Sequence, residues 1–222
     1  AANATVVSLV GNSLLLTASG GATLYYRSGR WLALVTSAAA YGLGSKDGEF
    51  ADAPFQSKIF EHVRVRRDIG SGWSIEAFGQ HEYDRWRRLK LRALAGTGLR
   101  LDAEATPEVH AVFGLAYMAL WEELLKPTEV DLQGVVFEHR VSSYATLAVA
   151  LSATSAVTAT LYVQPRIDLP SDIRGLIDVG LVVGIVKNLG LRVSWVLGYD
   201  TAPPANVRGY DGMTKVEFTA TF

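Results

Sequence analysis

The chain ends in two runs, residues 189–200 (LGLRVSWVLGYD) and residues 213–222 (MTKVEFTATF), in which apolar and polar side chains alternate. In the second run Val216, Phe218 and Phe222 fall on one face, whereas Lys215 and Glu217 fall on the other. Successive side chains of a β-strand point to opposite faces, so this pattern predicts two strands with one apolar and one polar face. A helix of the same content would spread its charges around its whole circumference.

The same alternation recurs along the chain. In residues 87–101 and 157–168, leucines and valines stand opposite arginines and threonines. A run of about ten residues is long enough to cross a membrane as a tilted strand. Counting the runs and their breaks predicts twelve strands, at residues 4–11, 14–27, 31–43, 55–67, 73–84, 87–101, 109–122, 137–151, 157–168, 173–185, 189–200 and 213–222.

The composition is too apolar for an ordinary soluble domain. Of the 222 residues, 49% are hydrophobic and 19% are charged, whereas a typical soluble domain has about 25% charged residues. A membrane-spanning helix needs roughly 18 uninterrupted apolar residues. The longest candidate, residues 176–186, is broken by Asp178, Gly180 and Gly184. A large buried sheet or a membrane barrel therefore remains.

Cysteine is absent and the formal net charge is −1. The lack of cysteine excludes disulfides, thiolate nucleophiles and cysteine-ligated metals. Basic residues are scattered among acidic ones, so the sequence shows no electrostatic footprint for nucleic acid. No basic and apolar leader precedes Ala1, and we therefore expect a mature protein.

The breaks between the predicted strands differ in length. Short breaks at residues 28–30, 68–72, 102–108, 152–156 and 186–188 contrast with longer ones at residues 44–54, 123–136 and 201–212. Outer-membrane barrels combine short periplasmic turns with longer extracellular loops. We therefore predict an all-β fold, a transmembrane antiparallel up-and-down β-barrel of about 12 strands in the bacterial outer membrane. It would form a single domain over residues 1–222, with both termini in the periplasm.

Aromatic residues lie near the predicted strand ends, where the two interfacial girdles of a barrel are expected. They are Trp31 and Trp73 at the periplasmic ends and Tyr41, Tyr83, Trp121 and Tyr199 at the outer ends. Ordinary strand aromatics would be the alternative for any one of them. Their joint placement favours girdles.

The polar faces of the predicted strands carry many charges. We predict that the lumen is lined by Arg64, Arg66, Glu76, Glu82, Lys90, Arg92, Arg100, Arg140, Arg166, Asp168, Arg174, Asp178, Arg192, Lys215 and Glu217. Charges in a dry interior are costly unless they pair or meet water. They would thus line a water-filled pore or form a network that plugs the lumen. A twelve-strand barrel is on the order of 23 Å across, so long arginines leave a narrow passage or none.

The apolar faces of the same strands are predicted to contact lipid. Leu161, Leu181, Val193, Trp195 and Phe218 are the lipid-facing candidates. Phe218 and the terminal Phe222 also resemble the signal read by the barrel-assembly machinery. The alternative is a last strand that simply ends on an apolar residue. We expect outer-membrane lipid and lipopolysaccharide as surroundings and the assembly machinery as a partner during biogenesis.

Four histidines, at positions 62, 81, 110 and 139, invite a metal or catalytic site. They lie on different predicted strands, and none has a close partner such as His-x-His. His62 and His110 are predicted to point inward, and His81 and His139 to lie at outer strand ends. We therefore expect no metal and no cofactor.

A lipid hydrolase is the enzyme that this architecture would suit. However, His139 and Ser142 point to opposite faces of one strand, while His139 and Ser143 are about 13 Å apart at roughly 3.3 Å per residue. Neither serine can form a nucleophile–base pair with this histidine. We expect no enzymatic activity, and a lipid-modifying hydrolase built from pairs on different strands is the less favoured alternative.

Residues 81–88 (HEYDRWRR) form the densest polar cluster, at a predicted outer turn. Glu82 and Asp84, with the nearby arginines, have the chemistry to bind a divalent cation or a lipopolysaccharide phosphate. The favoured alternative is a solvated hairpin tip whose charges pair with one another.

The order of several short motifs resembles the YdiY-like outer-membrane proteins, described as salt-induced or acid-inducible and classed as a domain of unknown function. The motifs are Gly11-Asn12, Tyr83-Asp84, Arg92, the run GTGLR at residues 96–100, Arg140-Val141-Ser142, Gln164-Pro165, Tyr199-Asp200, Pro203-Pro204, Asp211 and Phe222. The resemblance covers nearly the whole chain. It implies an outer-membrane barrel without an assigned chemical activity.

The leading hypothesis for function is a narrow pore or an envelope-adaptation protein with a charged lumen. A closed barrel that organises lipid or a partner is the main alternative. The sequence leaves open the substrate, the oligomeric state and whether the lumen conducts.

Overall fold

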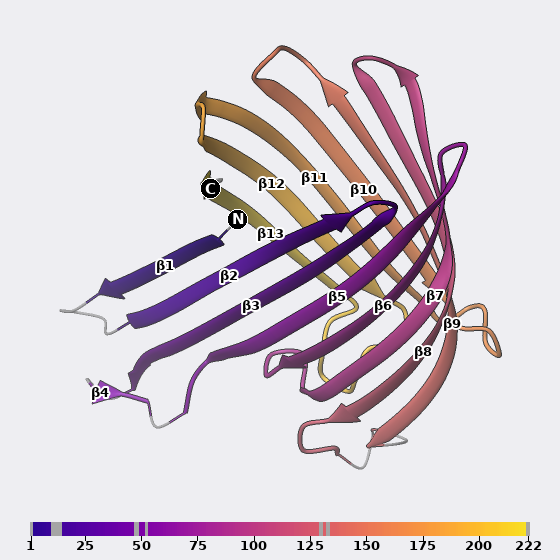
Figure 1. Ribbon diagram of the computed structural model, residues 1–222. Coiled ribbons are helices and arrows are strands. Elements are labelled where there is room, and N and C mark those ends of the chain that lie inside the picture. The colour runs from indigo at the N-terminus through magenta and orange to yellow at the C-terminus, as the bar shows by residue number, and fades with distance from the viewer. Residues whose placement is uncertain are drawn as a thin grey trace.

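The computed structural model describes residues 2–9, 15–46, 49–51, 53–128, 131 and 134–220. Within these ranges all regular secondary structure is β, in a curled antiparallel sheet (Figure 1). None of these residues belongs to a helix that is long and apolar enough to cross a membrane.

Thirteen strands are present in the described residues, twelve of them long and one of two residues. They are β1 (Ala2–Leu9), β2 (Leu15–Ser28), β3 (Trp31–Lys46), β4 (Glu49–Phe50), β5 (Gln56–Gly70), β6 (Trp73–Asp84), β7 (Leu89–Thr106), β8 (Val109–Leu124), β9 (Val135–Ala150), β10 (Ser155–Pro165), β11 (Ile173–Val186), β12 (Leu189–Asp200) and β13 (Tyr210–Ala220).

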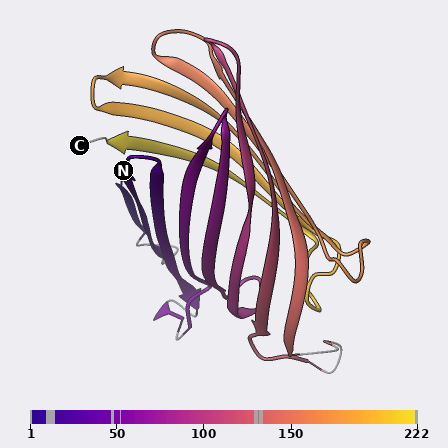
Figure 2. The same cartoon turned by 45° about the vertical axis from the view of Figure 1, so that its right-hand side comes forward.

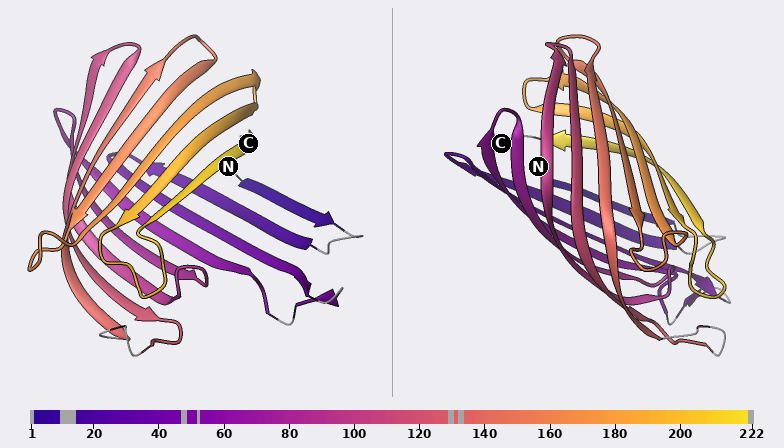
Figure 3. Two further views of the ribbon diagram at one scale, coloured as in Figure 1. Left: turned by 180° about the vertical axis from the view of Figure 1, so that it is seen from behind. Right: turned by 90° about the vertical axis from the view of Figure 1, so that its right-hand side faces the viewer.

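The long strands pair in sequence order, with β3 next to β5 because the short β4 pairs only with the end of β3. At the ends of the order, β1 pairs with β13 through Ala2 and Ala220. The sheet therefore curls until its first and last strands meet. Figures 1 and 3 show β1 and β13 close together at the two chain ends and diverging from there.

The predicted strands agree with the long strands of the structure. β6 and β12 have the predicted bounds, 73–84 and 189–200. β7 runs five residues further than the predicted 101, because the alternation continues through residue 106, whereas β10 ends at Pro165 instead of residue 168. Proline has no N–H to donate to a sheet ladder, which accounts for the earlier end. Residues 10 and 11 of the first predicted strand lie outside the described part.

Short turns gather at one end of the curled sheet and longer connections at the other (Figure 2). The turn between β5 and β6 shows why some positions need glycine. Ser71 and Gly72 both have positive φ, 54° and 78°, which is the geometry of a type I′ hairpin turn. A Cβ on Gly72 would lie 2.5 Å from the carbonyl oxygen of Asp102. Gly72 therefore lets the turn pack against β7.

One face of the sheet is apolar and exposed. Leu161, Leu181, Val193, Trp195 and Phe218 all lie on this face and are 38–62% exposed. Of the six girdle candidates, Tyr83 is half-buried and the others are exposed, at 43–53%: Trp31, Trp73, Tyr41, Trp121 and Tyr199. Exposed apolar side chains over a whole sheet face are typical of a surface that meets lipid.

The other face holds the buried charges and a small apolar core along β7 to β9. Leu89, Met118 and Leu120 are 1–2% exposed there. Close packing depends on Gly114, since a Cβ at that position would come within 2.0 Å of the Tyr144 ring. The Tyr144 ring fills this space and positions its hydroxyl on the inner wall.

Candidate functional site

A chain of charged side chains crosses the inner wall near the long-loop end of the sheet. Each member comes from the start or the end of a strand, at positions that alternation places on the inner face. In order, the linked residues are Asp84, Lys58, Glu82, Arg92, Glu122, Arg174 and Asp200. The contacts between nitrogen and oxygen atoms are 2.9–3.3 Å. This chain, called the ion belt below, ties β5–β8 to β11 and β12.

Arg92 is the central cation of the ion belt. Its guanidinium contacts Glu122 at 2.9 Å and Glu82 at 3.3 Å. The three side chains are only 6–10% exposed. Charges this far from water are stable only with their partners in place, because an unpaired one would pay the full cost of desolvation. The ion belt therefore holds the strand ends in register.

A second cluster surrounds Arg140, whose side chain is fully buried. Its nitrogens lie 2.8 Å from Glu138 and 2.8 Å from Asp172. Its Nη1 also donates to the carbonyl oxygen of Gln164 at 2.9 Å. Arg166 joins the same carboxylates at 3.4 Å and 3.7 Å.

The loop between β10 and β11 supplies half of this cluster. β10 ends at Pro165, Arg166 still forms an isolated bridge with Arg140 of β9, and residues 167–172 leave the sheet. The Ile167 N–H donates to the His139 carbonyl at 2.8 Å and the Arg166 N–H to the Asp172 carbonyl at 2.9 Å, which holds the loop against β9. The loop thereby places Asp172 over the buried Arg140.

Further toward the short-turn end, Glu76 is 1% exposed. It accepts a hydrogen bond from the Tyr144 hydroxyl at 3.0 Å and pairs with Arg64 at 3.4 Å. The Arg64 guanidinium also lies 5.5 Å from the centre of the Tyr144 ring, within the range of a cation–π contact. The inner wall is thus cross-linked along most of its length.

Three connections at the long-loop end are joined by one arginine. Arg88, in the turn between β6 and β7, pairs with Asp131 of the β8–β9 loop at 2.7 Å. It also donates to the carbonyls of Lys126 at 2.7 Å and Ala205 at 2.6 Å. Ala205 belongs to the β12–β13 loop, and its N–H donates to Asp131 at 2.9 Å. We call this arrangement the mouth latch, because it holds the loop that follows β12 against loops that follow β6 and β8.

The carboxyl group of Asp131 is well suited to this role. Hydrogen bonds from Arg88 and from the N–H groups of Thr128 and Ala205 hold its pKa well below the usual range. A carboxylate with a lowered pKa stabilises its contacts above the ordinary pKa of about 3.9 and loses them only as the pH falls through the lowered value. The mouth latch is therefore expected to persist at neutral and mildly acidic pH.

The structure corrects two of the predicted lumen residues. Lys90 stands at a bulge between Leu89 and Leu91, which breaks the alternation. Its 55% exposed side chain pairs with Glu123, on the face opposite to Glu122. Asp168 lies beyond the end of β10 and is 63% exposed. Its pKa is lowered because Arg166 donates to both of its oxygens.

The other predicted lumen residues whose side chains are described lie on the inner side of the sheet. Arg100 pairs with Asp102 at 2.6 Å, and Arg66 lies 3.8 Å from the same carboxylate. Arg192 pairs with Asp178 at 2.7 Å. Lys215 stands opposite Ser194 in the register of β12 and β13. The side chain of Glu217 and the whole of Phe222 lie outside the described residues.

The histidines are dispersed, as their positions in the sequence suggest. His62 stacks between Phe60 and Phe78 on the inner wall, and His110 lies 3.4 Å from Asp102. His81 lies 3.6 Å from Glu61. In the described ranges no three His, Asp or Glu side chains are grouped so that they could hold a metal ion.

His139 lies on the outer wall, beside a hollow of about 310 Å³ lined in part by Phe137 and Ile167. Its Nδ1 is hydrogen-bonded to the Tyr117 hydroxyl. Ser143 donates instead to the Val163 carbonyl at 2.9 Å, and Ser142 accepts from Gln164 at 3.1 Å. Neither serine is hydrogen-bonded to His139.

The sequence prediction missed several members of the network. Lys58 and Glu138 occupy the same alternating positions as the predicted lumen residues, so the pattern itself could have revealed them. Arg88, Asp131 and Asp172 lie in connections, where no periodic signal exists. Only the folded arrangement brings these three to the mouth.

The chain belongs to the family described as "Protein of unknown function, DUF481", which matches residues 2–222. This agrees with the resemblance to a domain of unknown function drawn from the sequence motifs. A comparison with curated protein sequences found no match.

Solved structures of low sequence identity superpose on this chain. The NanC porin structure superposes with a TM-score of 0.60 at 7% sequence identity, over 100% of this chain and 98% of that chain. The translocator domain of the autotransporter NalP from Neisseria meningitidis matches with a TM-score of 0.48 at 12% identity, over 100% of this chain and 86% of that chain. The likeness to NanC places the curled sheet among β-barrel folds.

Proposed function

We propose that the protein is an outer-membrane barrel of twelve long strands that acts as a narrow pore, with an outer mouth restricted by the mouth latch. The first and last strands meet at the chain ends, which supports closure into a barrel. The apolar outer face supports a membrane location. The similarity in fold to a protein described as a porin agrees with this function.

The observation that carries the proposal is the uneven filling of the inner face. The ion belt and the Arg140 cluster fill the sector around β6 to β9 with buried charges. By contrast, inward-facing side chains on β2, β11 and β13 stay exposed, with Tyr25 at 69%, Leu176 at 37% and Met213 at 51%. One sector is therefore packed and another is open to solvent, as a narrow passage beside a rigid wall requires.

In the proposed orientation the long loops face the outside and both termini face the periplasm. Short turns on the periplasmic side and longer loops outside are the rule for such barrels. Lipopolysaccharide would then surround the long-loop end, and the assembly machinery would read the C-terminal strand during biogenesis. The proposal contains no catalytic step, and the hydrogen bonds of Ser142 and Ser143 give no support for a hydrolase.

The barrel is expected to migrate differently on a detergent gel before and after boiling. A sheet with all of its strands paired leaves no free edge for detergent to attack, so the unheated protein should stay compact. Electrophoresis of matched heated and unheated samples measures this directly. Identical migration of a protein that is folded by circular dichroism would contradict closure into a barrel.

Opening the mouth latch is expected to increase the single-channel conductance in planar bilayers. Arg88→Gln removes the charge that binds Asp131 and the donors that bind the carbonyls of Lys126 and Ala205. The β12–β13 loop would then be free to leave the mouth. We expect about a twofold or greater rise in conductance or open time, since restricted mouths limit current.

Arg85→Gln is the matched control for this experiment. Arg85 lies in the same turn, and its side chain makes no ion pair or hydrogen bond in the described part of the chain. Arg85→Gln should therefore leave the single-channel current unchanged. If neither the wild type nor Arg88→Gln conducts while both are folded, the closed barrel is the better account.

A further inference from the structure

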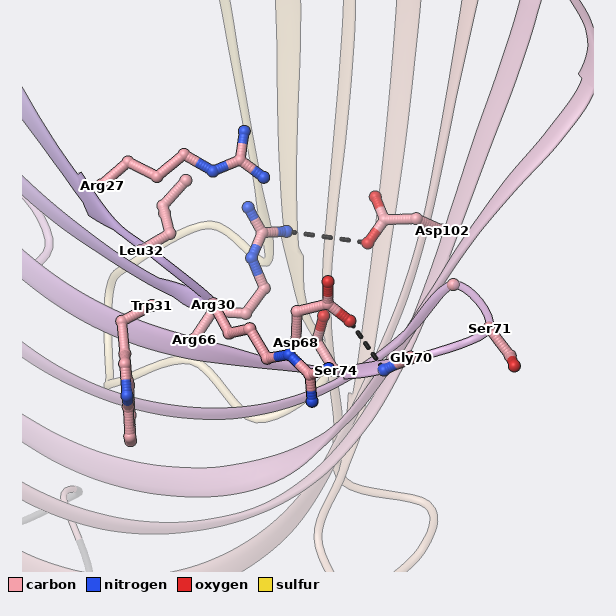
Figure 4. Close-up of a pocket in the computed structure, with 11 residues that line it drawn as sticks. Arg27, Arg30, Trp31, Leu32, Arg66, Asp68, Gly70, Ser71, Ser74 and Asp102 are labelled. Atoms are coloured by element: carbon pink, nitrogen blue, oxygen red, sulfur yellow. Dashed lines mark hydrogen bonds and ion pairs between the residues drawn. The ribbon is translucent and has the colours of Figure 1, made fainter.

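A second hollow, of about 280 Å³, lies at the short-turn end of the inner wall (Figure 4). Inward-facing Arg27, Leu32, Arg66, Ser74 and Asp102 line it, together with residues of the adjoining turns. It is separate from the ion belt and the mouth latch, which lie at the opposite end. Its lining is rich in arginine.

The charges around this hollow do not balance. Arg27, Arg30 and Arg66 contribute three positive charges, and Asp68 and Asp102 contribute two negative ones. Asp102 is already held by Arg100, with contacts of 2.6 Å and 2.8 Å to its two oxygens. With Arg100 included, four cations face two carboxylates, a local excess of two positive charges.

Arg66 is the most informative residue of the group. Its side chain is only 21% exposed, yet its closest carboxylate oxygen, on Asp102, is 3.8 Å away. That separation is too long for a hydrogen bond, and its guanidinium donates no hydrogen bond to any described residue, although Glu76 stands opposite Arg66 in the register of β5 and β6. Arg92 and Arg140, by contrast, each have acceptors at 2.9 Å or less. Arg66 thus retains donors directed into a hollow.

The neighbouring arginines have free donors as well. Arg27 and Arg30 are exposed, and neither makes an ion pair within the described ranges. Arg27 and Arg66 stand on either side of Leu32 in the register of β2, β3 and β5, and Figure 4 shows both of their side chains lining the hollow. Two guanidinium groups on one side of a cavity can hold the oxygens of a phosphate or a carboxylate in a forked geometry.

We propose that this hollow binds a small anionic solute through a phosphate or carboxylate group held by Arg66 and Arg27. Asp68 limits the affinity, because its carboxylate lies in the same lining and repels an anion. The site opens on the inner wall, which favours a free solute over a lipid headgroup. Binding here does not depend on whether the barrel conducts, so it can be tested separately from the proposed pore.

The test is calorimetric titration of the protein, in a maltoside detergent that carries no phosphate, with inorganic phosphate and with succinate. The wild type should bind at least one of them saturably, and added salt should weaken the binding. Arg66→Gln should weaken it about fivefold or more, since a charge-assisted forked contact is lost. Asp68→Asn should strengthen it by about twofold or more, because it removes repulsion and keeps the oxygen that accepts from the Gly70 N–H.

Arg67→Gln is the matched control, because Arg67 is the next residue on β5 and lies over the outward-facing Trp31 ring. It should bind the anions as the wild type does. Opposite changes in Arg66→Gln and Asp68→Asn cannot come from loss of fold, and heated and unheated gels check the fold of each variant.

Absence of saturable binding to either anion, or equal affinity of Arg66→Gln and Arg67→Gln, would overturn the proposal. A parallel titration with nanodiscs containing phosphatidylglycerol, set against neutral nanodiscs, distinguishes the source of the anion. Binding to the anionic lipid alone, weakened by Arg66→Gln, would support the arginine site and assign it to a headgroup phosphate.

Discussion

Replacing Arg140 by alanine is expected to lower the free energy of unfolding by about 3–5 kcal/mol. The Arg140 side chain is fully buried, and it neutralises Glu138 and Asp172, which are 6–7% exposed. Without it, the remaining ion pairs of these carboxylates are the longer ones to Arg166, at 3.4 Å and 3.7 Å. Two buried anions that repel each other would thus lose their main partner. Reversible urea unfolding in detergent micelles or lipid vesicles measures the loss.

Arg192→Ala is the control for this prediction. Arg192 is another paired arginine of the inner wall. It contacts Asp178 at 2.7 Å, and both side chains are 32% exposed. Water screens such a pair, so its removal should cost about 1 kcal/mol or less. If the two alanine variants lost the same free energy of unfolding, burial would not explain the contribution of the Arg140 cluster to stability.

A double-mutant cycle separates the ion pair from the packing of the arginine side chain. Asp172→Asn keeps the shape of its side chain but removes one charge. In the Arg140→Ala background, Asp172→Asn should lower the free energy of unfolding by less than it does in the wild type, because the partner charge has already gone. Additive losses would instead assign the effect to packing.

Unfolding measurements combined with single-channel currents bear on whether the lumen conducts. Arg92 is nearly as buried as Arg140 and belongs to the ion belt. A loss of stability in Arg92→Ala with an unchanged current would show that the belt is a structural wall beside the passage. A large loss of stability in a protein that never conducts would favour the closed barrel.

The alternation of side chains predicted most of the strands because it has a direct physical cause. Each strand has apolar surroundings on one side and polar contacts on the other. Apolar and polar side chains therefore alternate along it with a period of two residues. The bounds of β6 and β12 were predicted correctly for that reason. The bulge beside Lys90 was missed because one extra residue shifts the alternation without changing the composition of the run.

The ion network was predictable only in part. Inward charges such as Arg92 and Arg140 follow from alternation, but their partners depend on which strands become neighbours and how far side chains reach. Arg174 meets Glu122 although β9 and β10 lie between their strands in the sheet order. The mouth latch joins Arg88 to Ala205, 117 positions away. Such contacts between connections have no periodic signature in the sequence.

Replacing Leu161 by arginine is expected to destabilise the membrane-inserted protein by about 2–4 kcal/mol, the cost of a cation on the lipid face near the bilayer midplane. Leu161 lies in the middle of β10 and is 45% exposed on the apolar outer face. Its neighbour Thr160 points to the inner wall, where its hydroxyl lies 3.0 Å from that of Thr146.

Thr160→Arg is therefore the matched control, one residue away and on the opposite face. Thr160 stands opposite Asp178 in the register of β10 and β11, so a new cation there meets a carboxylate and water instead of lipid. We expect it to insert into vesicles and resist heat nearly as the wild type does. Urea unfolding in vesicles, together with the folded fraction on an unheated gel, compares the two variants. Equal tolerance of arginine at both positions would show that the exposed apolar face does not contact lipid, and the outer-membrane proposal would lose its main physical support.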